Sequence, residues 1–263
     1  MGSDMPDLRV SAAALVKRKG VPFPVVTAYD APFARFAESA GIDVLLVGDT
    51  LGMVVLGYEA TAPVELRDME RHGAAVVRGS QRAHVIVDLP FGSYEASDER
   101  AVESAVRLVK RTGSSSVKLE GGVRSSARIA AIVRAGIPVV GHIGVLPQTA
   151  ALGDGFRRRT AHDAILADAR AVVEAGAFAI VLEMVGAELT REVTATVPVP
   201  TIGIGSGPDC DAQVLVLHDL LGMFADPPPF VRRFADVGAV ATDGLRAYGD
   251  AVRDGTYPPR RPA

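Results

Sequence analysis

The sequence predicts a single-domain α/β protein, a (β/α)8 TIM barrel, and three observations favour that fold. The chain has 263 residues, and one such barrel takes roughly 250. Six apolar runs bounded by Gly or Pro alternate with helix-length segments, as the buried strands of a parallel sheet do. Five of the six runs end in Asp, Lys/Glu, His or Glu, and the chemistry of a barrel gathers at the carboxyl ends of its strands.

Each apolar run is interpreted as one strand. We expect the first strand at Pro24–Tyr29 and the last around Leu221–Phe224. Between them lie VLLVGDT at 44–50, HVIVDLP at 84–90, SVKLEGG at 116–122, IPVVGHIG at 137–144, FAIVLEMV at 178–185 and PTIGIGSG at 200–207. The ends of these six runs are 20 to 41 residues apart, enough for a helix and two loops. Right-handed crossovers then bring all the ends to one rim.

The segments between the strands carry helix signals. Ser97 can cap a helix with acidic residues in its first turn, and Thr160 with Asp163 begins another in the same way. A glycine in the left-handed conformation ends a helix, and four helical patterns close on Ala40-Gly41, Thr112-Gly113, Ala135-Gly136 and Ala175-Gly176. From Pro229 we expect a last helix, to about Arg253.

Composition supports one barrel domain over residues 1–263, with flexible ends at 1–10 and 256–263. Hydrophobic residues make up 48% of the chain and aromatic residues 5%, and there is no Trp, which fits a barrel interior of branched aliphatic side chains. The net charge of −3 comes with Arg spread along the chain, which argues against a nucleic-acid partner.

The same totals predict a cytoplasmic protein. The single cysteine, Cys210, cannot form an internal disulfide, which suits a reducing compartment. No apolar stretch reaches the length of a membrane span, and Met1–Val10 lacks the order of a signal peptide. We therefore expect no membrane partner.

Two carboxylates close neighbouring predicted strands. Asp49 and Asp88 should lie one strand spacing apart, about 4.8 Å, and two carboxylates so placed repel each other unless a cation or a proton lies between them. Glu120 ends the next strand and could complete a set of oxygen ligands, which suits Mg²⁺. The alternative is that Asp49 and Asp88 only cap the helices that follow.

Lys118 and Glu120 are two residues apart in one strand, so their side chains share a face, the barrel interior. Lys118 could neutralise an anionic substrate while Glu120 supports the metal, or the two could form a structural ion pair. His142 lies between glycines at another strand end and is either structural or functional. Glu183 follows five apolar residues, and apolar surroundings make a carboxylate a stronger proton acceptor, so Glu183 is the candidate base.

The segment Gly203–Gly207 could cradle a phosphate or form a tight turn. Cys210 lies between Asp209 and Asp211. Neighbouring carboxylates should raise the pKa of its thiol, so we do not interpret it as a nucleophile.

Seven stretches, which cover about residues 25 to 235, resemble the ketopantoate hydroxymethyltransferase family. They are TAYDAPFARFAESAGIDVLLVGDTLGM at 27–53, GYEATAPV at 57–64, VDLPFGSY at 87–94, VKLEGG at 117–122, PVVGHIGVLPQ at 138–148, LEMVGAEL at 182–189 and IGIGSGPDCDAQVLVLHDLLGM at 202–223. The resemblance implies transfer of a hydroxymethyl group from 5,10-methylenetetrahydrofolate to α-ketoisovalerate (3-methyl-2-oxobutanoate), through a Mg²⁺-stabilised enolate. The product is ketopantoate, in pantothenate biosynthesis.

The resemblance also implies roles for particular residues. The metal ligands are Asp49 and Asp88, with Glu120 in an outer position. The keto acid is held by Lys118 and by the segment at Asp49-Thr50. Glu183 is the base, and His142 acts near the folate or the metal, within the substrate site. The family further implies a homo-oligomer built from barrels, a decamer.

Four departures from the family pattern concern residues around the rim. Thr50 stands where the family has Ser, Leu146 where it has Thr and Gly186 where it has Pro, and residues 155–160 read Gly-Phe-Arg-Arg-Arg-Thr in place of a Gly-Tyr-Lys-Val-Gln-Gly type of segment. They keep open a Mg²⁺-dependent aldolase or hydroxymethyltransferase acting on a different 2-keto acid. A metabolite-binding barrel without catalysis and a phosphate-binding barrel are further alternatives.

Overall fold

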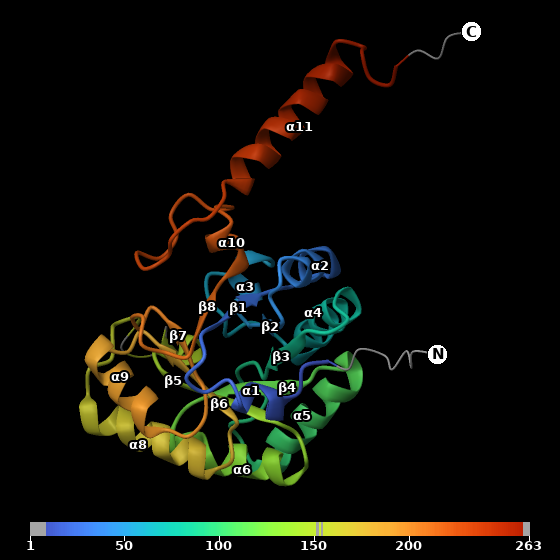
Figure 1. Ribbon diagram of the computed structural model, residues 1–263. Coiled ribbons are helices and arrows are strands. Elements are labelled where there is room, and N and C mark those ends of the chain that lie inside the picture. Colours follow the sequence, from blue (N-terminus) through green and yellow to red (C-terminus); the bar gives the residue numbers. More distant parts are fainter. Residues whose placement is uncertain (1–8, 151–152, 154, 260–263) are drawn as a thin grey trace, which may run out of the picture. The chain divides into compact units, whose positions relative to one another are not determined.

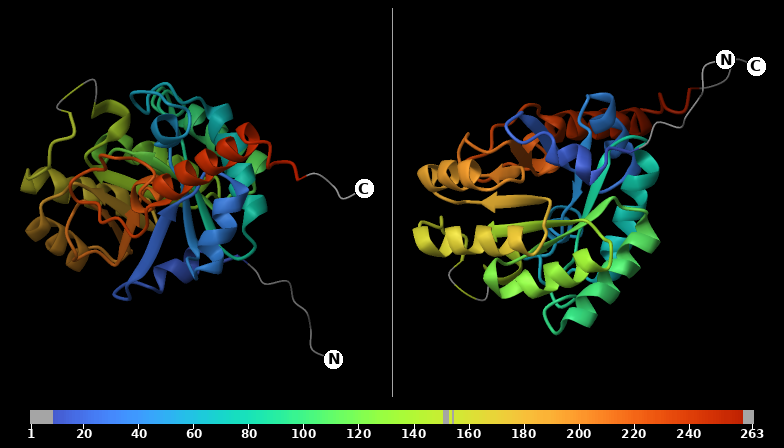
Figure 2. Two further views of the ribbon diagram at one scale, coloured as in Figure 1. Left: turned by 90° about the horizontal axis from the view of Figure 1, so that it is seen from above. Right: turned by 60° about the horizontal axis from the view of Figure 1, so that its bottom comes forward.

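Eight parallel strands close into a barrel within the part of the chain that the structure describes, and each strand pairs with the next in sequence. The structure is a computed structural model that describes residues 9–150, 153 and 155–259. Figure 1 shows the strands surrounded by helices, and the views in Figure 2 show the same layers from two other sides. The predicted TIM-barrel fold is confirmed.

The strands lie close to the predicted apolar runs. Their bounds are β1 Phe23–Thr27, β2 Val44–Val47, β3 His84–Asp88, β4 Ser116–Glu120, β5 Val139–Gly144, β6 Ala179–Glu183, β7 Thr201–Ile204 and β8 Ala212–Leu215. The last of these corrects the expectation of a strand around Leu221–Phe224. A turn at 205–211, and no helix, joins β7 to β8, so a spacing that assumed an intervening helix placed the strand too far along the chain.

The helices lie between and after the strands. Their bounds are α1 Ala12–Val16, α2 Ala31–Ser39, α3 Leu51–Val54, α4 Leu66–Gly79, α5 Asp98–Thr112, α6 Ser126–Arg134 after the 3₁₀ turn η1 Val123–Ser125, α7 Pro147–Ala150, α8 His162–Glu174, α9 Ala187–Thr196, α10 Leu217–Leu220 and α11 Val237–Arg253. Ser97 caps α5 as predicted, because its side chain accepts a hydrogen bond from Arg100 N. The glycines at 41, 113, 136 and 176 all have positive φ, which confirms the predicted helix ends.

Two predicted helix starts are wrong by a few residues. The cap position of α8 is Ala161, without a side-chain hydrogen bond, so Thr160 does not cap it. The last helix begins at Val237 and not at Pro229, because the side chain of Asp236 caps it by accepting from Ala239 N. A side-chain cap therefore sets this boundary, and not the proline run at 227–229.

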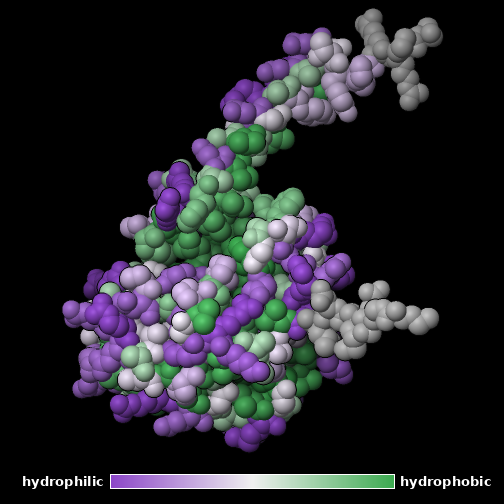
Figure 3. All heavy atoms as spheres, in the orientation of Figure 1, coloured by the Kyte–Doolittle hydropathy of each residue, from purple (hydrophilic) through white to green (hydrophobic). Residues whose placement is uncertain are grey.

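The barrel interior is filled by every second residue of the strands. The apolar cluster includes Val25, Val44, Leu46, Ile86, Val140, Val181 and Ile202. Because side chains alternate across a strand, the residues two positions further along β3 to β6 point into the same interior, at its carboxyl-terminal end. In Figure 3, hydrophilic residues are spread over the outer faces of α6, α8 and α9.

The chain divides into two compact units, one ending at Val214 and the other starting at Leu215. The second unit holds α10 and α11, and no residue of α11 is buried. The single-domain assignment for residues 1–263 stays a prediction. Within the described ranges, no helix is both long and apolar enough to cross a membrane.

Flexible ends were predicted at 1–10 and 256–263, and most of these residues, 1–8 and 260–263, lie outside the described part of the chain. Arg9 is held in place: its guanidinium donates hydrogen bonds to Ser80 Oγ and to three backbone carbonyls. Val10 N donates to Arg82 O. These hydrogen bonds tie Arg9 and Val10 to the segment 77–83, and the flexibility of the two ends stays a prediction.

Candidate active site

The predicted site residues meet at the carboxyl-terminal end of the barrel. The side chains of Asp88, Lys118, Glu120 and His142 come from β3, β4 and β5, and Asp49 follows β2 by two residues. None of these five residues is more than 4% exposed, whereas the Glu183 side chain at the end of β6 is 15% exposed. The structure thus gathers in one buried cluster the charges that the sequence placed at separate strand ends.

Asp49 and Asp88 are in contact through the backbone of Asp49, whose N–H donates to Asp88 Oδ2 at 3.1 Å. Burial, followed by the charges of Asp88 and Glu120, raises the pKa of Asp49 well above its usual value. Burial also raises the pKa of Asp88, against the opposing effect of Lys118. Asp88 Oδ1 is buried and has no hydrogen-bond partner among the described residues.

Lys118 supplies a positive charge to this group. Its Nζ lies 3.1 Å from Asp88 Oδ2 and 3.3 Å from His142 Nδ1. Burial opposes its protonation, but the carboxylates of Asp88, Glu120 and Asp49 outweigh that effect, and the pKa of Lys118 is raised. The raised pKa favours the protonated form of Lys118 at neutral pH. Of the two interpretations that the sequence left open for Lys118, the structural ion pair with Glu120 is not seen, because the carboxylate paired with Lys118 is that of Asp88.

His142 lies between two carboxylates. Its Nδ1 is 3.5 Å from Glu120 Oε1, and its Nε2 is 3.3 Å from Glu183 Oε2, close enough for an ion pair but not aligned as a hydrogen bond. Burial and the charge of Lys118 oppose protonation, yet the two carboxylates outweigh them and raise the pKa of His142 to about 9. A protonated imidazole donates from Nδ1 to Glu120, and Nδ1 then cannot accept from Lys118.

Two residues that sequence reasoning did not select belong to the same cluster. Tyr94 and Gln148 are each 2% exposed. Gln148 Nε2 donates to Asp49 Oδ2 at 2.7 Å, and Tyr94 O–H donates to Gln148 Oε1 at 2.6 Å. Tyr94 lies in the loop after β3, and Gln148 lies in α7 after β5. Both fall within the stretches 87–94 and 138–148 that resemble the family, and this position was their signal in the sequence.

The oxygen atoms of the cluster determine whether it can bind a hard cation. Among the residues described, no group of three or more His, Cys, Asp or Glu side chains is arranged to hold a metal ion. Glu120 is engaged elsewhere, because its Oε2 accepts from Gln148 N at 3.2 Å. Asp49 and Asp88 still fit a cation such as Mg²⁺, which takes one or two carboxylates and completes its shell with water and substrate oxygens. The orphaned Asp88 Oδ1 is a ready ligand atom.

The glycine-rich segment after β7 forms a turn. Ser206 Oγ donates to Leu182 O at 2.7 Å and accepts from Val185 N at 3.0 Å, and Arg158 Nη1 donates to Gly205 O at 2.9 Å. These internal hydrogen bonds favour a turn over a phosphate cradle. Burial raises the pKa of Cys210 to about 11, with Asp211 adding to the effect. The predicted direction is correct, but burial is the main cause.

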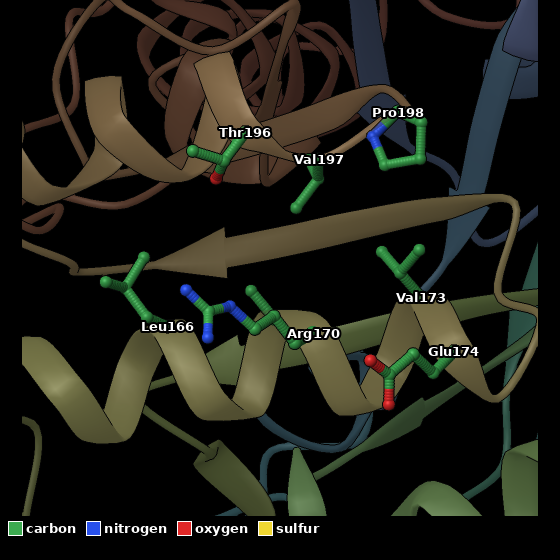
Figure 4. Close-up of a pocket in the computed structure, with 8 residues that line it drawn as sticks. Leu166, Arg170, Val173, Glu174, Thr196, Val197 and Pro198 are labelled. Carbon is green, nitrogen blue, oxygen red and sulfur yellow. The ribbon is translucent and has the colours of Figure 1, made fainter.

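A cavity of about 340 Å³ opens at the same rim as the buried cluster, lined by Arg124, Gly144, Leu146, Thr149, Ala150, Gly153 and Arg159. Gly144 ends β5 two residues after His142, so the cavity adjoins the site. A groove of about 130 Å³ lies elsewhere, between α8 and the residues that end α9 and follow it (Figure 4). Its only charged residues are Arg170 and Glu174, and none of the predicted site residues lines it.

Comparison with known proteins gives a consistent result along the chain. A sequence model described as ketopantoate hydroxymethyltransferase matches residues 8–260. The 3-methyl-2-oxobutanoate hydroxymethyltransferase of Moorella thermoacetica is 51% identical over 248 residues, 92% of each chain. The protein of the same name from Aeropyrum pernix is 49% identical and covers 97% of this chain and 94% of its own.

Solved structures with the same fold have other names. A phosphonopyruvate hydrolase superposes with a TM-score of 0.64 at 15% identity, over 95% of this chain and 90% of its own. A 2,3-dimethylmalate lyase, a member of the PEP mutase/isocitrate lyase superfamily, gives 0.62 at 18% identity, over 96% and 91%. At such low identity the likeness shows the barrel fold and nothing about the reaction.

Proposed function

Because this chain belongs to the ketopantoate hydroxymethyltransferase family, we propose that it transfers a hydroxymethyl group from 5,10-methylenetetrahydrofolate to 3-methyl-2-oxobutanoate. The activity named for its relatives is an enzymatic step toward pantothenate. The observation that carries the proposal is the buried cluster, in which a lysine, a histidine and three carboxylates surround the barrel end while Glu183 remains partly exposed. This cluster can bind an anion, bind a cation and move a proton.

The keto acid would bind against the cluster through its carboxylate and ketone oxygens. Lys118 offers a positive charge, and Thr50, a partly exposed residue directly after Asp49, offers a hydroxyl group. The negative charge of Asp88 compensates the positive charge of Lys118, and the carboxylate of a bound substrate would share that role. Lys118 and Thr50 are therefore proposed to hold the substrate, with Asp88 and Asp49 beside them.

Asp49 and Asp88 would hold Mg²⁺, with Glu120 in an outer position. A bound divalent cation would polarise the keto acid's carbonyl group as a Lewis acid. Burial and neighbouring charges raise the pKa of both aspartates. Their ionised forms are therefore unfavourable without a cation, and a bound cation would stabilise them. A cation relieves the repulsion between Asp49 and Glu120 that contributes to the raised pKa of Asp49.

Glu183 would remove the proton from C3 of the keto acid. Its Oε2 lies 3.3 Å from His142 Nε2, and this cationic imidazole holds the carboxylate at the edge of the cluster. His142 and Lys118 together stabilise the negative charge that the enolate carries after proton loss. The methylene carbon of the folate then bonds to C3 and to the oxygen of a water molecule, while its bonds to N5 and N10 break. The two nitrogens gain one proton from that water and the proton that Glu183 removed, so tetrahydrofolate leaves and the carboxylate of Glu183 is restored.

The folate would approach through the cavity at the rim, because the cluster itself is closed to solvent. Among the residues that the structure describes, the cavity is lined by two arginines, Arg124 and Arg159, and otherwise by uncharged residues. That charge suits the glutamate portion of a folate. His142 lies two residues before the lining residue Gly144. The proposed folate site is therefore next to the proposed site of the keto acid.

The test separates proton removal from one-carbon transfer. Wild-type protein with Mg²⁺ and 3-methyl-2-oxobutanoate in D₂O should exchange the C3 hydrogen without folate and should form ketopantoate when the folate is added. Glu183→Gln should lose exchange by at least about 100-fold, as removal of a general base does. Glu188→Gln, on the exposed surface of α9, is the matched control and should exchange like wild type. Exchange retained in Glu183→Gln would contradict the assignment of the base.

A second candidate is the same chemistry on a different 2-keto acid. Thr50 carries a methyl group beside the proposed substrate site, and Arg158 in the altered loop donates to Val185 O at 3.0 Å, near Glu183. Comparing turnover of straight-chain and branched 2-keto acids distinguishes the two substrates. A kcat/KM for another keto acid well above that for 3-methyl-2-oxobutanoate would favour the second.

The cytoplasmic location and the homo-oligomeric state expected from the sequence also remain proposals. The resemblance to the family motivates the oligomer, and the single cysteine motivates a reducing compartment.

A further inference from the structure

Gln148 contacts two carboxylates of the cluster at once. Its side-chain Nε2 donates to Asp49 Oδ2 at 2.7 Å, and its backbone N–H donates to Glu120 Oε2 at 3.2 Å. Glu120 ends β4, Asp49 follows β2 by two residues, and Gln148 itself lies in α7 after β5. One residue therefore links three separate strand ends.

The amide group of Gln148 can adopt only one of its two orientations. Nε2 donates its second hydrogen to Leu89 O at 3.0 Å, and a backbone carbonyl can only accept. On the other side, Oε1 accepts from Tyr94 O–H at 2.6 Å. A flipped amide would turn its oxygen toward Leu89 O and Asp49, and would lose all three hydrogen bonds.

Tyr94 fixes the orientation of the Gln148 amide by donating a hydrogen bond to its oxygen. Burial, with Glu120 nearby, raises the pKa of the Tyr94 phenol, so it remains a donor. Its single proton goes to Gln148 Oε1, since that contact is much shorter than the 3.3 Å from the hydroxyl to Glu120 O. Its oxygen accepts from Glu120 N at 3.3 Å. The Tyr94 hydroxyl thus also ties the amide to the strand that carries Glu120.

We propose that Gln148, held by Tyr94, is a positioning residue that fixes the orientation of the Asp49 carboxylate and sets the affinity of the site for its divalent cation. The inference rests on the proposed function in one respect, that Asp49 and Asp88 hold Mg²⁺. The hydrogen bond from Gln148 Nε2 to Oδ2 restrains rotation of the Asp49 carboxylate, and a carboxylate held in one orientation presents its remaining lone pairs in fixed directions. Neither Gln148 nor Tyr94 is proposed to contact the keto acid or the folate.

A packing role makes a different prediction from a positioning role. If Gln148 only fills space, Met at this position retains most of the volume and should leave cation binding unchanged. If the hydrogen bonds matter, Gln148→Met loses them and frees Asp49 to rotate. Tyr94→Phe removes one hydroxyl and keeps the ring, so it tests the same network with little risk to folding.

The experiment is a Mg²⁺ titration by calorimetry, without substrates, on wild type, Gln148→Met, Tyr94→Phe and the double variant. We expect Gln148→Met to weaken Mg²⁺ binding by about 10- to 100-fold, the usual effect of removing a partner of a metal ligand, and Tyr94→Phe to weaken it less. In the double variant, Tyr94→Phe should have no further effect, because it acts through Gln148. Gln213→Met removes an exposed glutamine that donates to Gly207 O, and it should bind Mg²⁺ like wild type.

Three outcomes in the variants would overturn the inference. They are affinity within twofold of wild type in a folded Gln148→Met, a full effect of Tyr94→Phe in the Gln148→Met background, and an equal loss in Gln213→Met. Wild type that binds no Mg²⁺ would overturn it as well. Ketopantoate formation by wild type, measured separately, tests the proposed function, so the two failures are distinguishable.

Discussion

The charged side chains of the site lie together because side chains along each strand alternate between the barrel interior and its outer face. In β4, Ser116, Lys118 and Glu120 are two residues apart, so their side chains lie on one face of the strand. All three are buried. Asp49 does not follow this rule. It comes two residues after β2 ends, and its position depends on the turn into α3.

His84, at the opposite end of β3 from Asp88, predicts how the free energy of unfolding depends on pH. Its Nδ1 donates to Val10 O at 2.8 Å and its Nε2 accepts from Ser116 Oγ at 2.9 Å, the pattern of a neutral imidazole. Burial lowers the pKa of His84 to about 4. The unfolded chain, with a histidine pKa near 6.5, therefore binds the proton first as the pH falls.

The stability contributed by neutral His84 is complete above about pH 6.5 and is lost as the pH falls toward 4, by about 3 kcal/mol in total. Urea unfolding at about pH 7 and pH 4.5 should show a larger loss of unfolding free energy in wild type than in His84→Gln, which does not titrate. Equal losses in the two proteins would contradict this account.

Among the elements, α2 and α4 approach each other where only glycine fits. A Cβ added to Gly79, the last residue of α4, would lie 2.5 Å from Ala31 O and 2.6 Å from Ala31 Cα. These are backbone atoms at the start of α2, and they cannot rotate away as a side chain does. The contact therefore fixes how closely the two helices pack outside β2 and β3.

Gly79→Ala should lower the free energy of unfolding by about 1 to 3 kcal/mol, the usual cost of overpacking. Gly244→Ala in α11 is the matched control, since a Cβ there meets no atom within 4 Å, and alanine should favour that helix by up to about 1 kcal/mol. Chemical denaturation measures both. An unchanged midpoint for Gly79→Ala would show that α2 can shift.

At the scale of the whole molecule, the barrel alone does not specify the reaction. Its fold is shared with a lyase and a hydrolase at 15–18% identity, as is common for TIM barrels. What distinguishes this chain is the set of side chains at the barrel end, together with relatives of about half identity over most of its length.

The mass in solution is the prediction that belongs to this scale. A chain of 27.5 kDa that forms the decamer expected from the family should have a mass of about 275 kDa, measured by light scattering on a size-exclusion column. A mass of one chain at micromolar concentration would contradict the oligomer.

The strand positions could largely be predicted because each strand is a short apolar run between Gly and Pro. The position of β8 could not, since Ala212–Leu215 follows β7 after a turn without a helix, and no periodicity marks such a turn. The same limit applies to the start of α11, which the side-chain cap of Asp236 decides.

The sequence by itself determined the barrel, and it determined which chemical groups reach its carboxyl-terminal end, because both follow from local periodicity and from the fixed direction of parallel strands. Only the tertiary structure decided the partners of those groups. Lys118 pairs with Asp88, His142 lies between Glu120 and Glu183, and Gln148 links Asp49 to Glu120. These contacts join residues up to 99 positions apart, and their geometry depends on how the strands pack around a common centre, which no local pattern records.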